Sequence, residues 1–437
     1  MNAETPLWAV IPFALYLLSI AALPLVITET WERHRHKLAA GLALLAGVPV
    51  AIFLLARPGG VATLGAIALD YGAFIALLGA LFVISGGMYI GGAWGGTPAV
   101  NGAFLAVGAV LANIIGTTGA SALLIRPLLR ANAGRPRLDH LVVFFIFVVS
   151  NAGGLLTPLG DPPLFLGFLR GVPFAWTLRL LPIWALVNGV LIVTFVLVDR
   201  AVVKRDGVRS APTREPISLA GRINLVWLAG VIATVLLLGT LGRRWLRDEH
   251  ARALAQIGLL LGMAALSWFT TPRSARAANR FSLAPMVEVA VVFAGIFATI
   301  APALAYLDEQ GTRVGLIQPW HFFWATGLLS SVLDNAPTYL AFVSVATGVA
   351  DAGRGSLSSA HLAALAEHPT GAPLLAAISS GAVLMGALTY FGNGPNLMVK
   401  AIAEEHGTPT PTFPAYLGWA VVILIPLLVV VTLLFFH

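Results

Sequence analysis

The sequence predicts an all-α, polytopic membrane protein, and three observations support this fold class. The chain of 437 residues is 58% hydrophobic and only 10% charged, whereas a soluble domain carries about 25% charged residues. Its mean hydropathy is +0.89. Apolar runs of about 20 residues recur along the chain, which is the length that a helix needs to cross the hydrocarbon core. These properties exclude an ordinary soluble globular domain.

The charge and the cysteine content exclude several kinds of site. The chain has no cysteine, so disulfides, thiolate metal sites and cysteine nucleophiles are excluded. The net charge of +7 lies in the predicted loops, where it indicates topology rather than nucleic-acid binding. The sequence contains no phosphate-binding glycine loop, no histidine pair at metal spacing and no GxSxG motif. We therefore predict no enzyme activity, no cofactor and no nucleic-acid partner.

About ten helices are expected to cross the membrane. The first of them follows Glu4 and lacks a basic leader, so we interpret it as a retained helix and not a signal peptide. His140 and Trp184 lie near segment ends, where we expect them at the membrane interface. The expected crossings are residues 7–28, 38–56, 66–90, 138–169, 176–198, 222–241, 251–269, 284–306, 373–403 and 413–436.

Two further apolar segments, residues 97–131 and 319–349, are too long for one crossing and are polar in the middle. Each could form one long helix or a re-entrant hairpin that enters half-way and returns. If both are hairpins and the N-terminus is outside, most of the 26 lysines and arginines lie in inside loops, as the positive-inside rule requires. Four arginines within residues 243–252 stay outside and weaken this assignment. We predict a multi-pass protein of the inner membrane with both termini outside.

A repeat divides the chain into two halves of opposite orientation. The helices at 66–90 and 284–306 are both rich in small residues, which permit close helix packing. Each is followed by a hairpin candidate, a broken helix and an apolar closing helix, and five crossings separate equivalent points. Inverted repeats with broken helices that meet near the midplane are typical of secondary transporters.

The repeat also sets the expected domain boundaries. A polar and basic stretch, residues 199–222, is expected to link the halves. The predicted regions are peripheral N-terminal helices at 1–60; a first repeat at 61–204, with hairpin 97–131 and broken helix 138–169; a linker and connecting helices at 205–282; and a second repeat at 283–437, with hairpin 319–349 and broken helix 373–403.

Four polar stretches interrupt the apolar segments and form the candidate site. Exposed backbone groups at membrane depth cost several kcal/mol each, so such breaks persist where they line a cavity or bind a ligand. Half-helix N-termini favour anions, and unwound carbonyl groups favour cations. The stretches are NIIGTTGAS (113–121), NAGGLLTPLGDPP (151–163), DNAPT (334–338) and TYFGNGPN (389–396). The candidate ion- or substrate-binding residues are Asn113, Thr117, Thr118, Ser121, Asn151, Thr157, Gly160, Asp161, Asp334, Asn335, Thr338, Thr389, Asn393 and Asn396.

Each half contributes one carboxylate, from a different type of element. Asp161 in GDPP aligns with Asn393 in GNGP, whereas Asp334 lies at the tip of the second hairpin. An ionisable residue at membrane depth is a functional candidate by default. Hard oxygen ligands suit Na⁺, and a carboxylate can exchange that ion for a proton. We therefore expect Asp161 and Asp334 to bind Na⁺, with Na⁺ and H⁺ as the coupling ions, and Glu288 is a candidate proton relay.

Structural roles could explain the same residues without a ligand. Asp161 is followed by two prolines, which is a favourable helix N-cap with proline in the first turn. Asp334 could cap the hairpin tip in the same way. Asn151 and Asn335 could satisfy backbone groups that the breaks leave free. Glu288 lies near the inner end of its span and could snorkel to the interface.

At these motifs the sequence resembles the ion-transporter superfamily, which includes NhaD-type sodium/proton antiporters, arsenite permeases, CitMHS citrate transporters and divalent-anion symporters. The resemblance covers most of residues 60–436. The stretch 151–163 is similar to the G-D-P-P break of the antiporter and permease branches, and SSVLDNAPTYL (330–340) resembles their second hairpin. Residues 113–132 and 392–404 look close to a branch of citrate or sodium/proton transporters. The resemblance implies two hairpins, a site between hairpin tips and helix breaks, and a homodimer with an elevator-like transport domain.

Three functions agree with these patterns. Both hairpin tips lack the Ser-Asn-Thr triplet of the divalent-anion branch, and the four breaks contain no Arg or Lys, which favours cation exchange. The first hypothesis is a secondary antiporter that exchanges Na⁺ or Li⁺ for H⁺ by alternating access. The second is a Na⁺- or H⁺-coupled symporter of citrate or a similar carboxylate, and the third is a channel or a membrane-embedded enzyme. The expected partners are a small ion or small organic anion, the lipid bilayer and a second copy of the chain.

Overall fold

The computed structural model describes residues 5–92, 95–207, 218–238, 246, 248–310, 313, 315–333, 335–354 and 362–437. Its elements are almost all helical, which confirms the predicted all-α class. In the described part of the chain, nine helices are long and apolar enough to cross a membrane. Eight of these match predicted crossings, and the ninth is the expected hairpin at Pro98–Ala131. Two predicted crossings, at 7–28 and 222–241, contain shorter apolar helices, and residues 239–245 lie outside the described ranges.

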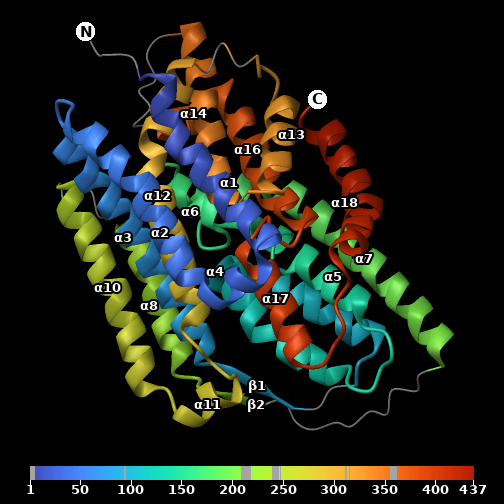
Figure 1. Ribbon diagram of the computed structural model, residues 1–437. Coiled ribbons are helices and arrows are strands. Elements are labelled where there is room, and N and C mark those ends of the chain that lie inside the picture. Colours follow the sequence, from blue (N-terminus) through green and yellow to red (C-terminus); the bar gives the residue numbers. More distant parts are fainter. Residues whose placement is uncertain are drawn as a thin grey trace.

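A first group of helices forms a layer along one side of the molecule (Figure 1). In this layer α2 packs on α12, α3 on α10, and α1 on both α2 and α12. The short 3₁₀ helix and the α-helices of this group are η1 (Leu7–Val10), α1 (Ile11–Val26), α2 (Thr28–Leu55), α3 (Gly60–Gly86), α8 (Asn224–Leu236), α10 (Glu249–Thr270), α11 (Arg273–Ala278) and α12 (Ala284–Gln310).

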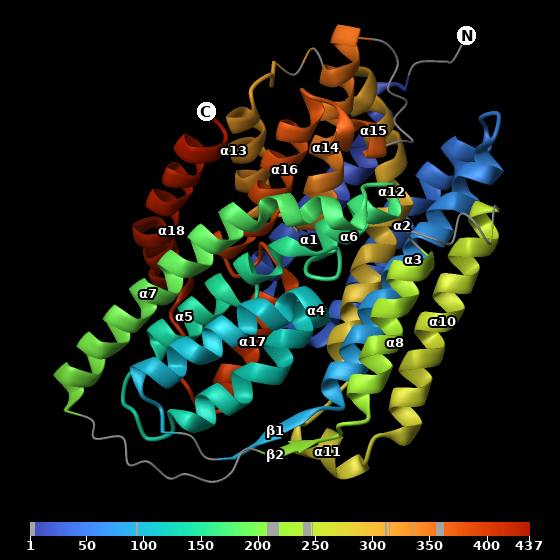
Figure 2. The same ribbon diagram turned by 180° about the vertical axis from the view of Figure 1, so that it is seen from behind.

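A second group contains the hairpins and the broken helices and meets the first where α3 packs on α4 and α12 on α14 (Figure 2). Its elements are α4 (Pro98–Ala131), α5 (Asp139–Val148), η2 (Ala152–Leu156), α6 (Pro162–Leu169), η3 (Phe174–Leu180), α7 (Leu181–Asp206), α13 (Pro319–Ser330), α14 (Asn335–Arg354), α15 (Leu362–Glu367), α16 (Gly371–Met385), η6 (Gly386–Leu388), α17 (Gly394–Glu405) and α18 (Phe413–Phe435).

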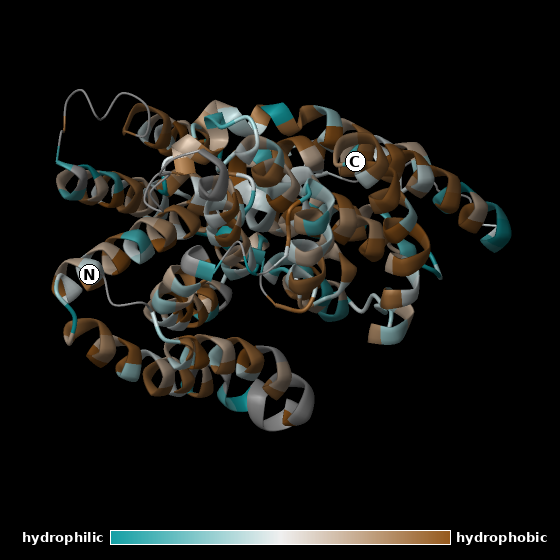
Figure 3. Cartoon of the chain, turned by 90° about the horizontal axis from the view of Figure 1, so that it is seen from above, coloured by the Kyte–Doolittle hydropathy of each residue, from teal (hydrophilic) through white to brown (hydrophobic). Residues whose placement is uncertain are grey.

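The crossing predicted at 66–90 ends earlier than expected, because α3 stops at Gly86 and a strand follows. This strand, β1 (Tyr89–Gly91), pairs antiparallel with β2 (Ser218–Ala220). The pairing joins the end of α3 to the chain that precedes α8. Seen from above, hydrophobic residues dominate the peripheral helices, whereas paler and more polar segments gather toward the middle (Figure 3).

The helix α4 is a hairpin, which excludes the alternative of one long helix. Its middle residue, Gly116, has a φ of +76°, a conformation that residues with a Cβ rarely adopt. In a straight helix, residues 101 and 132 would lie about 46 Å apart. Instead, Asn101 Nδ2 donates to Asn132 Oδ1 at 2.9 Å, and Asn132 Nδ2 donates to Asn101 Oδ1 at 2.8 Å. The two arms therefore return to the same end.

The base of this hairpin is fixed to α5 and α7 by buried polar side chains. Asp199 accepts hydrogen bonds from Asn101 and Arg135 and pairs with the ring of His140, whose Nε2 lies 2.9 Å away. The expected interfacial position of His140 is wrong, because its side chain is buried against Asp199. The linker expected from residue 199 is also wrong at its start, because α7 continues to Asp206 and buries Asp199. An isolated buried charge would be costly, so this ion pair forms within a hydrogen-bonded cluster.

The second hairpin consists of α13 and α14, which both lie at the upper end of the molecule in Figure 1. A Gln318–His321 capping box starts α13, and residues 331–333 form the turn at its end. Asp334 lies outside the described residues. Both arms pack on α16, so the tip of the hairpin reaches the second broken helix.

The two broken helices run in opposite directions through the centre of the second group. The first half of one lies beside the second half of the other: α5 packs on α17, and α16 packs on α6. Figure 1 shows α16 above the centre and α17 below it. This crossing brings both breaks to the same depth in the fold.

Candidate ion and substrate site

A single buried carboxylate, Asp161, occupies the centre of the site and is only 2% exposed. Its Oδ1 accepts a hydrogen bond from Thr117 Oγ1 at 2.9 Å, and its Oδ2 accepts one from Asn335 Nδ2 at 2.5 Å. Asn393 Nδ2 lies 3.2 Å from Oδ1. The two hairpin tips and the second helix break therefore all donate to the carboxylate that begins α6.

The local sequence explains why Asp161 is held at a break. Pro162 and Pro163 occupy the first turn of α6, where their missing N–H groups leave no unsatisfied donor. A Cβ on Gly160 would lie 2.1 Å from Gly154 O, so a side chain there would prevent the close approach of the backbone at residues 154 and 160. Asp161 occupies the N-cap position, but its side chain makes no capping hydrogen bond. Its oxygens face the tertiary donors instead, which argues against a purely capping role.

A chain of amides connects the two breaks. Asn393 Nδ2 also lies 3.1 Å from both Ser150 O and Asn151 Oδ1. Asn151 Nδ2 donates to Ile146 O at 2.9 Å and to Asn396 Oδ1 at 2.8 Å. Asn396 Nδ2 in turn donates to backbone carbonyls of the second break. Three predicted asparagines thus satisfy backbone and side-chain groups in both halves, as the structural alternative expected for Asn151.

Each break is also attached to the hairpin of its own half by a threonine. Thr157 Oγ1 donates to Asn113 O at 2.5 Å, and Thr389 Oγ1 donates to Ser331 O at 2.5 Å. In the first half, Thr117 N donates to Gly160 O at 2.8 Å, which adds a backbone link. Asn113 completes the contact, because its side chain bonds Gly153 O and Leu156 N. The hairpin tips are consequently held against the breaks by both backbone and side-chain groups.

One acceptor at the centre has no partner in the described part of the chain. Asn335 is fully buried, and its Oδ1 forms no hydrogen bond although its Nδ2 is bound to Asp161. A buried acceptor without a donor is unusual in native proteins and calls for a bound water or ion. With Asp161, it supplies hard oxygen ligands of the kind that a small cation prefers. Among the described residues, no cluster of three or more acidic, histidine or cysteine side chains could hold a metal ion.

The remaining predicted residues lie at different distances from this centre. Ser121 is buried and lies 2.8 Å from Ser150, Oγ to Oγ, so it joins the first hairpin to the start of the first break. Thr338 is buried in the first turn of α14, and Thr118 is half-buried beside Thr117. Glu288 is half-buried near the start of α12, in the other group of helices. Asp334 cannot be placed, because it is outside the described ranges.

Two side chains of α7 support the first break and were missed by the sequence reasoning. Trp184 Nε1 donates to Gly153 O at 2.8 Å, and Asn188 Nδ2 donates to Ala152 O at 3.2 Å. Trp184 is half-buried, and its predicted place at the membrane interface stays a prediction. An asparagine inside an apolar helix was the available signal, because a buried amide needs a partner.

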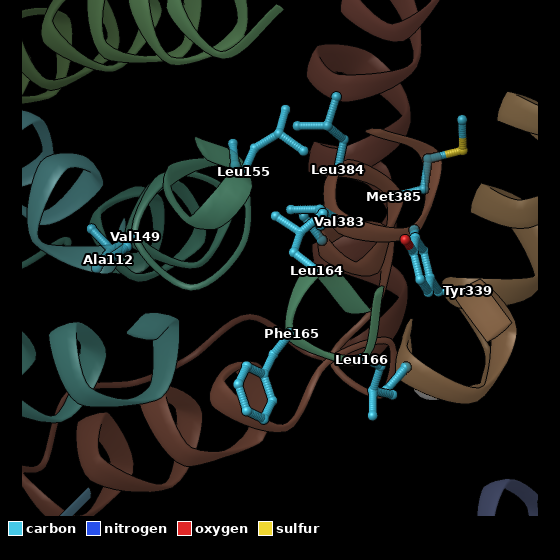
Figure 4. Close-up of a cluster of buried hydrophobic side chains, with 14 of the residues drawn as sticks. Ala112, Val149, Leu155, Leu164, Phe165, Leu166, Tyr339, Val383, Leu384 and Met385 are labelled. Carbon is cyan, nitrogen blue, oxygen red and sulfur yellow. The ribbon is translucent and has the colours of Figure 1, made fainter. Parts of the chain in front are cut away.

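An apolar shell surrounds the polar centre. Figure 4 shows Leu155 and Leu164, from the two sides of the first break, directed toward Val383 and Leu384 of α16. All four side chains are at most 2% exposed. A carboxylate in such surroundings interacts strongly with any cation beside it, because the local dielectric constant is low. In this structure the site is closed to solvent.

Comparisons with known proteins agree with this architecture. A family model described as "Putative citrate transport" matches residues 2–436. An uncharacterized transporter of Synechocystis sp. is 27% identical over 332 residues, which cover 71% of each chain. Because the family model spans nearly the whole sequence, the chain belongs to this family of multi-pass membrane transporters.

Proposed function

We propose that the protein is a secondary transporter of the inner membrane that exchanges Na⁺ or Li⁺ for H⁺, with Asp161 as the group that binds either cation. One observation carries the proposal: a buried carboxylate lies between both hairpin tips and both helix breaks, beside the unpartnered acceptor Asn335 Oδ1. A cation bound there would be surrounded by the one formal negative charge of Asp161 and by neutral oxygen atoms. Asp334 is the second proposed carboxylate, since it precedes Asn335 in the sequence.

The chemistry of exchange follows from competition for one carboxylate. When Na⁺ is bound, the oxygens of Asp161 and Asn335 replace part of its hydration shell. When a proton is bound, Asp161 is neutral and its attraction for Na⁺ is lost. The two ions therefore exclude one another, and a gradient of either one drives the other. Glu288, near the start of α12, is the proposed proton relay between this site and the first group of helices.

Alternating access requires that the site open to one side at a time. The two hairpins come from opposite halves of an inverted arrangement, and each contributes one donor to Asp161. Movement of the first tip would free Thr117, and movement of the second would free Asn335. When a cation or a proton is bound to Asp161, the hydrogen bonds from Thr117 and Asn335 contribute less to stabilising the carboxylate. Ion occupancy is thereby coupled to the release of a hairpin tip.

The decisive test is ion-driven proton flux in proteoliposomes. Asp161→Asn should abolish Na⁺-driven and Li⁺-driven proton movement, since an amide can neither carry the charge nor exchange a proton. Asp139→Asn is the matched control, because Asp139 is exposed at the start of α5, and it should keep wild-type flux. Full flux in Asp161→Asn, with correct folding, would refute the proposal.

A second candidate is a Na⁺- or H⁺-coupled symporter of citrate or a similar carboxylate, which the family description favours. In that case Asp161 would bind the coupling cation, and this cation would offset the repulsion between Asp161 and an anionic substrate. Uptake of labelled citrate that requires an imposed cation gradient would establish this candidate. Proton flux driven by Na⁺ without any organic anion would instead establish exchange.

A further inference from the structure

A cavity lies away from Asp161, between two turns that belong to opposite halves. Its volume is about 260 Å³. One wall is the turn that joins α4 to α5, residues 129–138, and the other is residues 406–409, which follow α17. Arg130, Arg135 and His406 line it. The cavity therefore bridges the base of the first hairpin and the end of the second broken helix.

Positive charge predominates around this cavity. Arg126 Nη2 lies 3.9 Å from Glu405 Oε2, and Arg280 Nη1 lies 2.9 Å from Glu405 Oε1. Together with Arg130, these residues set three guanidinium groups against one carboxylate. The Nε atom of Arg126 is buried and has no hydrogen-bond partner among the described residues. The cluster therefore carries excess positive charge, although Arg126, Arg280 and Glu405 lie beside the cavity and do not line it.

The arginines that line the cavity differ in how many of their N–H groups already have a hydrogen-bond partner. Arg135 is bound to Asp199 and Asn132, so its role is structural. Arg130 Nη2 donates to Ile90 O at 2.7 Å, and its guanidinium lies 5.0 Å from the Tyr89 ring centroid. These two contacts fix its orientation and leave further N–H groups for a ligand.

The ring of His406 is the third lining group, and the described residues offer it no hydrogen bond. Burial lowers the pKa of His406, and the positive charges of Arg126, Arg280 and Arg130 lower it further, while Glu405 acts in the opposite direction. His406 lies just after the C-terminal end of α17. Its ring is consequently a sensitive reporter of the potential in the cavity.

We propose that this cavity is a binding site for a phosphate-bearing anion, either the headgroup of an anionic lipid or a free phosphate. Guanidinium groups form charge-assisted, often bidentate hydrogen bonds with phosphate oxygens. Basic pockets between membrane helices are known to receive acidic lipid headgroups. A bound phosphate would join α4 to the end of α17 and would reduce relative movement of the first hairpin and the second broken helix. The site is separate from Asp161 and independent of the transported ion.

The test uses the full-length protein with ¹³C-labelled histidine, in detergent, and follows the His406 ring by NMR. The His406→Gln spectrum identifies its signal. Three probes are titrated at constant ionic strength set by NaCl: inorganic phosphate, short-chain phosphatidylglycerol and short-chain phosphatidylcholine. A bound phosphate should raise the pKa of His406, because a nearby negative charge favours its protonated form. Phosphatidylcholine should have no effect at the same concentration.

The variant Arg130→Gln should weaken the effective probe about tenfold, the loss expected when one charge-assisted hydrogen bond is removed. Lys204→Gln is the matched control, because Lys204 is an exposed cation in the last turn of α7, outside the cavity. A response to phosphatidylglycerol alone would identify a lipid site, and a response to inorganic phosphate would identify a soluble ligand. Lys204→Gln should respond like the wild type. The proposal is overturned if no phosphate probe shifts the His406 signal, or if Arg130→Gln binds the effective probe as tightly as the wild type and Lys204→Gln do.

Discussion

The two helix breaks share one backbone design but carry different charges. Asp161 has φ −143° and ψ 144°, and Asn393 has φ −154° and ψ 137°. In both breaks a glycine just before this residue approaches the carbonyl of another glycine six positions earlier, Gly160 with Gly154 and Gly392 with Gly386. The geometry of the site is therefore duplicated, although a carboxylate occurs in only one copy.

The hairpin tips show the same combination of symmetry and difference. Thr117 and Asn335 lie at the matching ends of their hairpin turns, and both donate to Asp161. Asn393, which occupies the position equivalent to Asp161, donates to Asp161 as well. The two halves thus both place hydrogen-bond donors around Asp161. Because the second half carries Asn393 at the equivalent position, the site has one negative charge, which lies at Asp161.

Exchange of the two residues between positions 161 and 393 should have the largest effect. Asp161→Asn combined with Asn393→Asp keeps the composition but should leave ion-driven flux at least about 100-fold below wild type. The reason is that position 393 faces Ser150 O and Asn151 Oδ1, which are acceptors and would repel a carboxylate. Flux is measured in proteoliposomes against Asp161→Asn alone. Restored flux in the exchanged variant would show that the two halves are functionally equivalent.

The glycine pair tests the shared backbone design. A Cβ at position 160 would lie 2.1 Å from Gly154 O, whereas one at 392 would lie 2.6 Å from Gly386 O. Overpacking of this kind costs about 1–3 kcal/mol. Gly160→Ala should therefore lower the thermal unfolding midpoint more than Gly392→Ala does. Gly189→Ala on α7, where a Cβ meets no atom within 4 Å, is the control and should not lower the midpoint, because alanine favours a helix interior over glycine.

The threonine pair gives the smallest expected difference. Thr157→Val and Thr389→Val each remove a hydrogen bond to a hairpin carbonyl, at a cost of about 0.5–1.5 kcal/mol. Thr389 also accepts from Phe391 N and Gly392 N, so its replacement should be the more destabilising. Thermal unfolding of the two variants in the same detergent measures the difference. Equal midpoints would mean that the additional acceptor role of Thr389 contributes nothing.

Much of the fold could be predicted because it depends on local physics. Apolar length predicts helices, and the cluster of glycines and prolines in residues 151–163 predicts the interruption there. The hairpins were less certain, since one long helix was an equal alternative for residues 97–131. The deciding contact, between Asn101 and Asn132, joins residues 31 positions apart. The errors at His140 and Asp199 have the same origin, because a polar residue near a segment end can face either lipid headgroups or a buried partner.

By itself, the sequence determined the class of protein, the places where helices break, and the fact that one break contains aspartate and the other asparagine. Only the tertiary structure decided that both hairpins and both breaks meet at Asp161. Thr117, Asn335 and Asn393 are 44, 174 and 232 positions from it. Hydrophobic length and Gly/Pro conformational preferences act within a few residues, so they can be read along the chain. Donors that reach a common acceptor from distant segments depend on how the helices pack.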